Sequence, residues 1–273
     1  MYFQTPTLVS LTTAAIRAVR LRPQLFVLLA ALAGILSALL YMPSAAVITE
    51  IMLAIEASND AEGSATELSR ILEDGLGTLF LGHLMVTAVT TFLSIPWARA
   101  VAPGGLMPTE GGVPAFFRRG LRSFFHMVAA NGITILLGLV ALPLVAVLTS
   151  GLGGLGSAVM MTSLVILIWA ALALTGLAHL AIAAEARDRR ETLLTAWRRG
   201  RFFLMPITAS LALFLLSAFV VNMVLAPIVA ALLPDGSEQL VVAALSGAIL
   251  YGASALHIGA LYLVPDFRDL NPT

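Results

Sequence analysis

The chain has 273 residues, of which 59% are hydrophobic and only 11% are charged, and its formal net charge is zero. A water-soluble domain carries about 25% charged residues, so this composition excludes an ordinary soluble globular protein. Because there is no cysteine, disulfides, thiolate metal sites and a cysteine nucleophile are also excluded.

Six apolar runs of about 20 residues dominate the chain, and each is long enough to cross a hydrocarbon core about 30 Å thick. In chain order, the predicted spans are Gln24–Tyr41, Leu76–Trp97, Met127–Thr149, Ser157–Ala184, Leu204–Leu233 and Leu240–Val264. Their continuous apolarity indicates helices rather than barrel strands, because barrel strands alternate apolar and polar residues. The sequence therefore predicts an all-α polytopic membrane protein with a single domain over residues 1–273.

Three arginine-rich stretches each precede a pair of spans: Ala15–Arg22, Phe116–Arg122 and Ala196–Arg201. Each has apolar side chains on one face and arginines on the other, which is typical of helices that lie in the headgroup plane. We therefore predict three interfacial amphipathic helices. The alternative is that these stretches extend the spans and that their arginines only enforce topology. Nine arginines are the candidates for contact with anionic lipid headgroups: Arg17, Arg20, Arg22, Arg118, Arg119, Arg122, Arg198, Arg199 and Arg201.

The starts of two of these helices have recognisable signals. Thr5 and Pro6 have the form of an N-cap and first helical residue for the first stretch. Asp188 and Glu191 form a capping-box-like pair ahead of the third stretch. We expect the first and third helices to begin at these positions.

The segment Glu50–Asp74, between the first two spans, is acidic and has helix signals of its own. Apolar residues at helical spacing in Ser44–Ala57 predict that the first span continues beyond its apolar core. Ser64–Glu67 has the form of a capping box. These signals favour a small outward cap of two short helices around Asn59–Gly63, and a solvated loop is the alternative.

Arginine counting predicts the orientation of the chain. If both termini lie on one side, that side holds fourteen of the fifteen basic residues, and the other side holds only Arg70. Cytoplasmic segments carry such an excess of arginine, so both termini are expected in the cytoplasm.

The second, fourth and sixth spans end in similar ways, because each is followed by an arginine: Arg99, Arg187 and Arg268. A unit of basic stretch, outward span, return span and arginine would repeat at about residues 5–100, 109–188 and 189–269. We predict a threefold internal repeat of parallel topology, related by an axis near the membrane normal. Convergence through the positive-inside rule is the alternative.

No motif in the chain indicates a reaction. Gly151–Gly156 spells G-x-G-x-x-G, but it lies between two spans, where a tight turn is expected. His83, His179 and His257 fall in three different spans, and His83 lies about 12 Å deeper than His179, so helix packing is favoured over a shared metal site. No acid or arginine lies inside a predicted span, which argues against ion-coupled transport. We expect no enzyme activity and no cofactor.

Small residues recur along the sixth span, where Gly247, Gly252 and Gly259 are expected to allow close helix packing. Asn131 and Asn222 are polar residues inside spans, and both are expected to cross-link helices. Internal packing is the favoured use of the small residues, and a subunit interface is the alternative.

Arg190–Phe202, which contains the motif A-W-R-R-G-R, resembles a family of six-span bacterial inner-membrane proteins. That family includes the membrane domain attached to some glycerophosphoryl diester phosphodiesterases, and Ala115–Phe124 resembles an earlier basic segment of the same family. The resemblance covers most of the chain in layout and these two segments in residues. It implies a bacterial inner-membrane location and a role in envelope homeostasis. Phosphodiesterase activity does not carry over, because no catalytic domain is present in this sequence.

We therefore expect a non-enzymatic inner-membrane protein that organises anionic lipids or partner membrane proteins, as an accessory subunit or a homo-oligomer. Nucleic acid is not an expected partner. The alternative is a transporter or channel for an apolar or zwitterionic solute. An intramembrane enzyme ranks third, because no pair of titratable groups lies in the spans.

Overall fold

A computed structural model describes residues 6–57, 61–102, 111–150, 153–234 and 238–263. These residues form eight α-helices and one short 3-10 helix, with no strand among them. The elements are α1 (Leu8–Leu21), α2 (Pro23–Ala57), α3 (Ala61–Ala100), α4 (Gly112–Thr149), α5 (Gly153–Glu185), α6 (Leu193–Gly200), η1 (Arg201–Phe203), α7 (Leu204–Leu232) and α8 (Glu238–Leu263). The predicted all-α fold class is confirmed.

Within the described residues, six segments are long and apolar enough to cross a membrane. They are α2, α3, α4, α5, α7 together with the preceding α6, and α8. Each of the six predicted spans falls on its own helix, in the predicted order. The chain therefore has the architecture of a multi-pass membrane protein.

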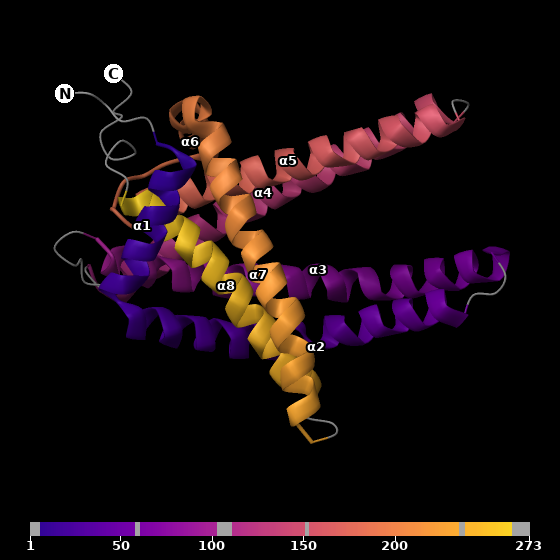
Figure 1. Cartoon of the computed structure of the whole chain (residues 1–273), viewed down its shortest axis with the longest axis horizontal. Helices are drawn as coiled ribbons and strands as arrows, with labels where there is room; N and C mark the ends of the chain where they lie inside the picture. The colour runs from indigo at the N-terminus through magenta and orange to yellow at the C-terminus, as the bar shows by residue number, and fades with distance from the viewer. Residues whose placement is uncertain (1–5, 58–60, 103–110, 151–152, 235–237, 264–273) are drawn as a thin grey trace.

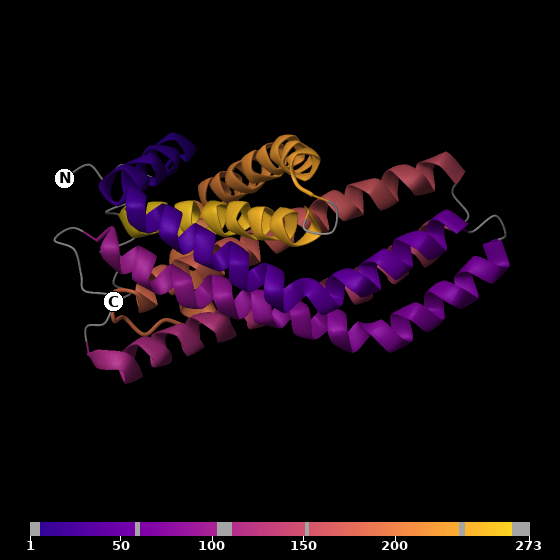
Figure 2. The ribbon, with the colours of Figure 1, turned by 90° about the horizontal axis from the view of Figure 1, so that it is seen from below.

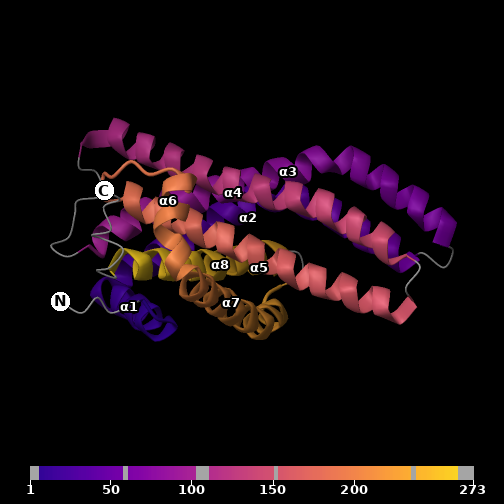
Figure 3. The ribbon, with the colours of Figure 1, turned by 90° about the horizontal axis from the view of Figure 1, so that it is seen from above.

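The long helices form three antiparallel hairpins, α2–α3, α4–α5 and α7–α8 (Figure 1). The tips of the α2–α3 and α4–α5 hairpins lie at the right in Figure 1. The α7–α8 hairpin crosses them, and its tip lies at the bottom of the same view. Figure 2 and Figure 3 place α1, α6, the start of α4 and the end of α8 together at the opposite end, which we call the base.

The packed core lies at the base. One cluster of buried apolar side chains joins Leu11 of α1, Ile95 of α3, Ile182 of α5 and Ile207 of α7. By contrast, the most apolar stretch of α4 has no buried residues, and in that of α5 only 6% of the residues are buried. Such an exposed apolar surface is suited to contact with lipid, so the α4–α5 hairpin is expected to be surrounded by acyl chains rather than by protein.

Helix α8 packs closely against α2 and α3 at glycines. A Cβ atom at Gly247 would lie 3.2 Å from the Cα of Gly34 in α2, and one at Gly259 would lie 3.0 Å from the Nε1 of Trp97 in α3. At Gly252 the nearest atom would be 3.5 Å away, which is an ordinary contact. Gly247 and Gly259 therefore lie at close internal contacts, where small residues let helices approach.

The three arginine-rich stretches have three different backbone structures. The first forms the separate helix α1, and the third forms α6 and η1. The second does not form a helix of its own, because α4 runs without a break from Gly112 to Thr149. This stretch extends the span, as the alternative predicted for its backbone. The threefold repeat stays a prediction, and the sixth-span exit Pro265–Arg268 lies outside the described residues.

The expected helix starts need correction. Helix α1 is capped by Thr7, whose side chain accepts a hydrogen bond from the backbone of Ser10, and Thr5 lies outside the described residues. Helix α6 begins at Leu193 after the N-cap Thr192, so the prediction that Asp188 opens this helix is wrong. Thr192 is the N-cap because its hydroxyl oxygen accepts a hydrogen bond of 3.2 Å from the backbone N–H three residues later.

The outer segment also differs from expectation. The continuation of the first span through Ser44–Ala57 is confirmed, because α2 extends to Ala57. The prediction of two separate short helices around Asn59–Gly63 is wrong, because Ser64–Glu67 lies inside α3, which begins at Ala61. Helical propagation adds one hydrogen bond per residue without a new nucleus, so extending the spans is cheaper than starting new helices. Residues 58–60 and the side chains of residues 56–68 lie outside the description.

The G-x-G-x-x-G sequence follows the end of α4, and its last four residues, Gly153–Gly156, form the start of α5. A helix rather than a strand precedes it, which excludes the dinucleotide-binding arrangement. Gly153 has a positive φ of 52°, and a Cβ atom at Gly156 would lie only 2.5 Å from the carbonyl oxygen of Thr149. These glycines therefore allow the tight reversal, and residues 151–152 of the motif lie outside the described part.

Candidate functional site

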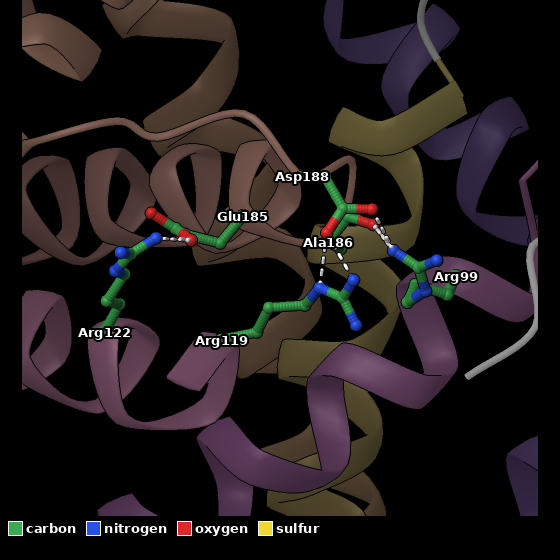
Figure 4. Close-up of polar contacts among 6 residues, drawn as sticks. All are labelled: Arg99, Arg119, Arg122, Glu185, Ala186 and Asp188. Atoms are coloured by element: carbon green, nitrogen blue, oxygen red, sulfur yellow. Dashed lines mark hydrogen bonds and ion pairs between the residues drawn. The ribbon is translucent and has the colours of Figure 1, made fainter. Parts of the chain in front are cut away.

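Charged side chains from α3, α4, α5 and α6 meet at the base around the connection between α5 and α6. We call this group the arginine–acid cluster, and its members are Arg99, Arg119, Arg122, Glu185, Asp188, Glu191 and Arg199. Figure 4 shows how its first part is arranged, with Asp188 between two arginines and Glu185 beside a third. Ion pairs therefore join α3, α4 and the end of α5 through residues that lie 63 to 89 positions apart along the chain.

Asp188 links α3 to α4. Its Oδ2 accepts a hydrogen bond of 2.9 Å from Nη1 of Arg99, and its Oδ1 accepts one of 2.6 Å from Nε of Arg119 (Figure 4). Arg99 is fully buried and Arg119 is 5% exposed, so one carboxylate compensates two buried guanidinium groups. Burial by itself would raise the pKa of Asp188, but the hydrogen bonds and charges of Arg99 and Arg119 outweigh it and hold that pKa below its usual value.

Asp188 can reach both arginines because of how α5 ends. The N–H of Arg189 bonds to the carbonyl of Ala184, and the N–H of Asp188 bonds to that of Glu185. With Asp188 at a φ of 61°, these bonds form the Schellman arrangement that closes a helix C-terminus. The residue expected to start α6 instead terminates α5.

Two further ion pairs extend the cluster. Arg122 lies 3.5 Å from Glu185, which is 2% exposed, and Arg199 lies 2.5 Å from Glu191 with both side chains nearly buried. Burial raises the pKa of Glu191 above its usual value, although the charge of Arg199 opposes this. Beside them, the guanidinium group of Arg187 lies 4.1 Å from the ring centre of Tyr262.

The start of α4 has its polar face turned inward. Arg119, Arg122, Ser123 and His126 follow one another at positions i, i+3, i+4 and i+7, which places them on one helix face. Arg119 and Arg122 on this face bind acids of α5 and its connection, whereas the apolar residues Phe117, Leu121 and Phe125 are exposed. Two of the three arginines in this stretch therefore contact protein rather than the surroundings.

The nine candidate headgroup arginines therefore divide into two groups. Three of them form internal ion pairs: Arg119, Arg122 and Arg199. Six are exposed and are called the exposed arginines: Arg17, Arg20, Arg22, Arg118, Arg198 and Arg201. Among these, the guanidinium group of Arg201 lies 4.7 Å from the ring centre of Phe202.

The span histidines form two separate contacts. Nδ1 of His179 lies 2.9 Å from Nδ1 of His257, whose Nε2 donates to the carbonyl of Ile207, and His83 lies 3.1 Å from Nδ2 of Asn131. No group of three potential metal ligands occurs within the described residues. The histidines and Asn131 thus connect neighbouring helices.

Asn222 also cross-links two helices, because its Oδ1 accepts a hydrogen bond of 2.9 Å from Ser246 of α8. The acids of the cluster were not predicted as site residues. The sequence did contain a signal for them, because acids and arginines are interspersed over Glu185–Glu191. Membrane topology requires only the arginines, so the acids among them needed another explanation.

No family model, curated protein or solved structure matches the chain. The resemblance carried by Arg190–Phe202 and Ala115–Phe124 therefore stays a prediction. Function has to be argued from the geometry of the base.

Proposed function

We propose that this chain is a non-enzymatic protein of the bacterial inner membrane that organises anionic phospholipids around its base. Both termini lie in the cytoplasm in this proposal. The observation that carries it is the exposed arginines, which come from α1, the start of α4, α6 and η1 and lie at one end of the molecule (Figures 2 and 3).

The charge balance at the base favours anions. The acids Glu185, Asp188 and Glu191 already pair with buried or half-buried arginines. The exposed arginines therefore face their surroundings as a net positive surface. Each cation near an anionic membrane surface contributes about 1 kcal/mol, and this attraction weakens as salt screens it.

The apolar surface supports the same proposal. Large hydrophobic side chains stand exposed along the α4–α5 hairpin, including Leu136, Val140, Leu148 and Val165. A basic end next to a long apolar hairpin offers one surface to lipid headgroups and the other to acyl chains. The partners in this proposal are anionic lipids, and a second membrane protein or another copy of the chain would bind through the same apolar hairpins.

The test is the lipid that the purified protein retains. The full chain is prepared from membranes in a non-ionic detergent, and its bound lipids are identified by mass spectrometry. In the exposed-arginine variant, all six exposed arginines are changed to glutamine. We expect the wild type to be enriched in anionic over zwitterionic lipid relative to the membrane, and the variant to lose this enrichment.

Arg70→Gln is the matched control, because Arg70 lies on α3 at the far end from the base and is also exposed. This control should retain the lipid composition of the wild type. An exposed-arginine variant with unchanged anionic lipid would overturn the proposal.

A further inference from the structure

A polar contact between α3 and α4 lies exposed in the middle of two membrane spans. Nε2 of His83 lies 3.1 Å from Nδ2 of Asn131, and the contact is exposed rather than covered by the described part of the chain. Each residue lies within two positions of the midpoint of its span, which is Ser69–Ala100 in α3 and Gly112–Thr149 in α4. The surroundings of this pair in a membrane are therefore hydrocarbon.

One donor and one acceptor of this pair lack a partner. Because the amide nitrogen of Asn131 can only donate, Nε2 of the neutral His83 imidazole accepts, and its Nδ1 carries the proton. That N–H and Oδ1 of Asn131 make no hydrogen bond within the described residues. Exposed span hydroxyls such as those of Thr162 and Ser217 instead bond to a carbonyl four residues earlier in their own helix. A polar group without a partner in hydrocarbon costs free energy, so the pair favours contact with a further hydrogen-bonding group.

The helix faces that carry the pair are open beside it. Phe80 lies one turn from His83 on α3, and Ile135 lies one turn from Asn131 on α4, and both apolar side chains are exposed. Gly138 lies two turns from Asn131 on the same face, and a Cβ atom there would meet nothing within 4 Å. The α2–α3 and α4–α5 hairpins separate toward their tips (Figure 1). Another helix therefore has access to the pair and to the apolar side chains around it.

The chemistry of the pair selects a second copy of the chain as the partner. Acyl chains offer no hydrogen bond, and lipid headgroups lie at the membrane surface rather than at mid-span. Nδ1–H of His83 in each copy complements Oδ1 of Asn131 in the other, so the pair is self-complementary. The opposite orientation of the amide exchanges donor and acceptor and keeps this property. A twofold axis along the membrane normal relates two copies that are inserted in the same direction, so it brings identical residues to the same depth.

We propose that His83 and Asn131 form the centre of a symmetric homodimer interface made by α3 and α4. Polar side chains hydrogen-bond across helices in membranes, and small residues such as Gly138 let those helices approach closely. The inference goes beyond the proposed function and does not depend on the exposed arginines. Those arginines lie at the base, whereas His83 is about 25 Å along α3 from the end of that helix at Ala100.

The test is the dimerisation of the purified full chain in liposomes of phosphatidylethanolamine and phosphatidylglycerol. Because the chain has no cysteine, the substitution Thr13→Cys attaches a single fluorophore to each copy. Photobleaching steps then count the copies in each liposome over a series of protein-to-lipid ratios. The first test variant is the double substitution His83→Leu and Asn131→Leu, which makes the face apolar. The second is Gly138→Leu, which adds bulk where a single copy has open space.

Each test variant has a matched control. Asn222→Leu removes a polar cross-link between α7 and α8, so it carries a lesion similar to that of the double variant on another hairpin. Gly154→Leu adds the same side chain as Gly138→Leu at a glycine of α5 that is also open. Both controls, and the exposed-arginine variant, should dimerise as the wild type does.

We expect the wild type to form dimers whose share rises with the protein-to-lipid ratio. One hydrogen bond between membrane helices contributes about threefold to affinity, so losing two reciprocal bonds should weaken dimerisation of the double variant about tenfold. Gly138→Leu should weaken dimerisation at least as strongly, because the helices no longer approach closely. Its helical content by circular dichroism should equal that of the wild type.

A cross-linking measurement locates the interface. Phe80→Cys places a thiol beside His83, and Met223→Cys places one at an exposed position of α7. Under a mild oxidant in membranes, Phe80→Cys should form a disulfide-linked dimer faster than Met223→Cys.

Three results would overturn the homodimer. They are a wild type that stays monomeric at every ratio, wild-type dimerisation in either test variant, and cross-linking at Met223→Cys that equals or exceeds that at Phe80→Cys. Lipid enrichment is measured separately on the exposed-arginine variant, so the dimer and the proposed function fail independently.

Discussion

Replacing Asp188 by asparagine should destabilise the base of the molecule. Asparagine has the shape of aspartate and tolerates the left-handed backbone at this position, so the change removes charge and leaves the Schellman turn in place. Removing one partner of a buried ion pair costs about 3–5 kcal/mol. The Asp188 side chain is 51% exposed, so water offsets part of this cost. We therefore expect a loss of about 2 kcal/mol, less than for a fully buried pair.

The assay is unfolding of the purified chain in mixed micelles by a denaturing detergent, followed by circular dichroism. A second change, Arg99→Met, completes a double-mutant cycle with Asp188→Asn. Because the two side chains are in contact at 2.9 Å, the cycle should give a coupling energy of about 1 kcal/mol or more. Arg190→Gln, an exposed arginine of the same connection, serves as the control and should change stability by less than about 0.5 kcal/mol. Additive losses in the cycle would refute the role assigned to Asp188.

The pH dependence follows from the same geometry. The pKa of Asp188 is below its usual value of 3.8, so this carboxylate stabilises the folded state above that pH and loses its contribution as pH falls through the lower folded pKa. The pKa of Glu191 is above its usual value of 4.5, so its contribution is greatest below that pH and declines as pH rises through the raised folded pKa. Asp188→Asn should remove the acid-side loss, and Glu191→Gln should remove the decline on the alkaline side.

Three other outcomes are expected. Gly34→Ala should destabilise the chain by about 2 kcal/mol or more, because its Cβ would lie 2.2 Å from a backbone carbonyl oxygen of α8, and the same unfolding assay measures it. Gly132→Ala should instead be neutral or stabilising by up to about 1 kcal/mol, since a Cβ there meets nothing within 4 Å and alanine is the better helix former. In spheroplasts, a membrane-impermeant maleimide should label Glu73→Cys but not Thr13→Cys, because the chain has no other cysteine and α1 is expected on the cytoplasmic side; the reverse labelling would contradict the orientation.

The spans could be predicted because they depend on a local property. A run of about 20 apolar residues has one stable arrangement in lipid, whatever surrounds it. The turn at Gly151–Gly156 was equally local, since it only required glycine between two such runs. The length of α3 was not predictable in this way, because the polar residues before Leu76 gave separate capping signals that a continuous helix overrides.

The arginine–acid cluster was not predictable for the opposite reason. Helical spacing shows that Arg119 and Arg122 share a face, but it does not tell whether that face meets headgroups or acids. Their partners Glu185 and Asp188 lie more than 60 residues away along the chain. The positive-inside rule counts paired and exposed arginines equally, so it predicts an orientation without separating them.

The division into paired and exposed arginines predicts how lipid binding responds to salt. An exposed arginine on a long flexible side chain binds any anionic surface, and salt weakens that attraction. Raising the salt concentration should therefore release the anionic lipid held by the exposed arginines. Anionic lipid that stays bound unchanged at high salt would refute this electrostatic attraction.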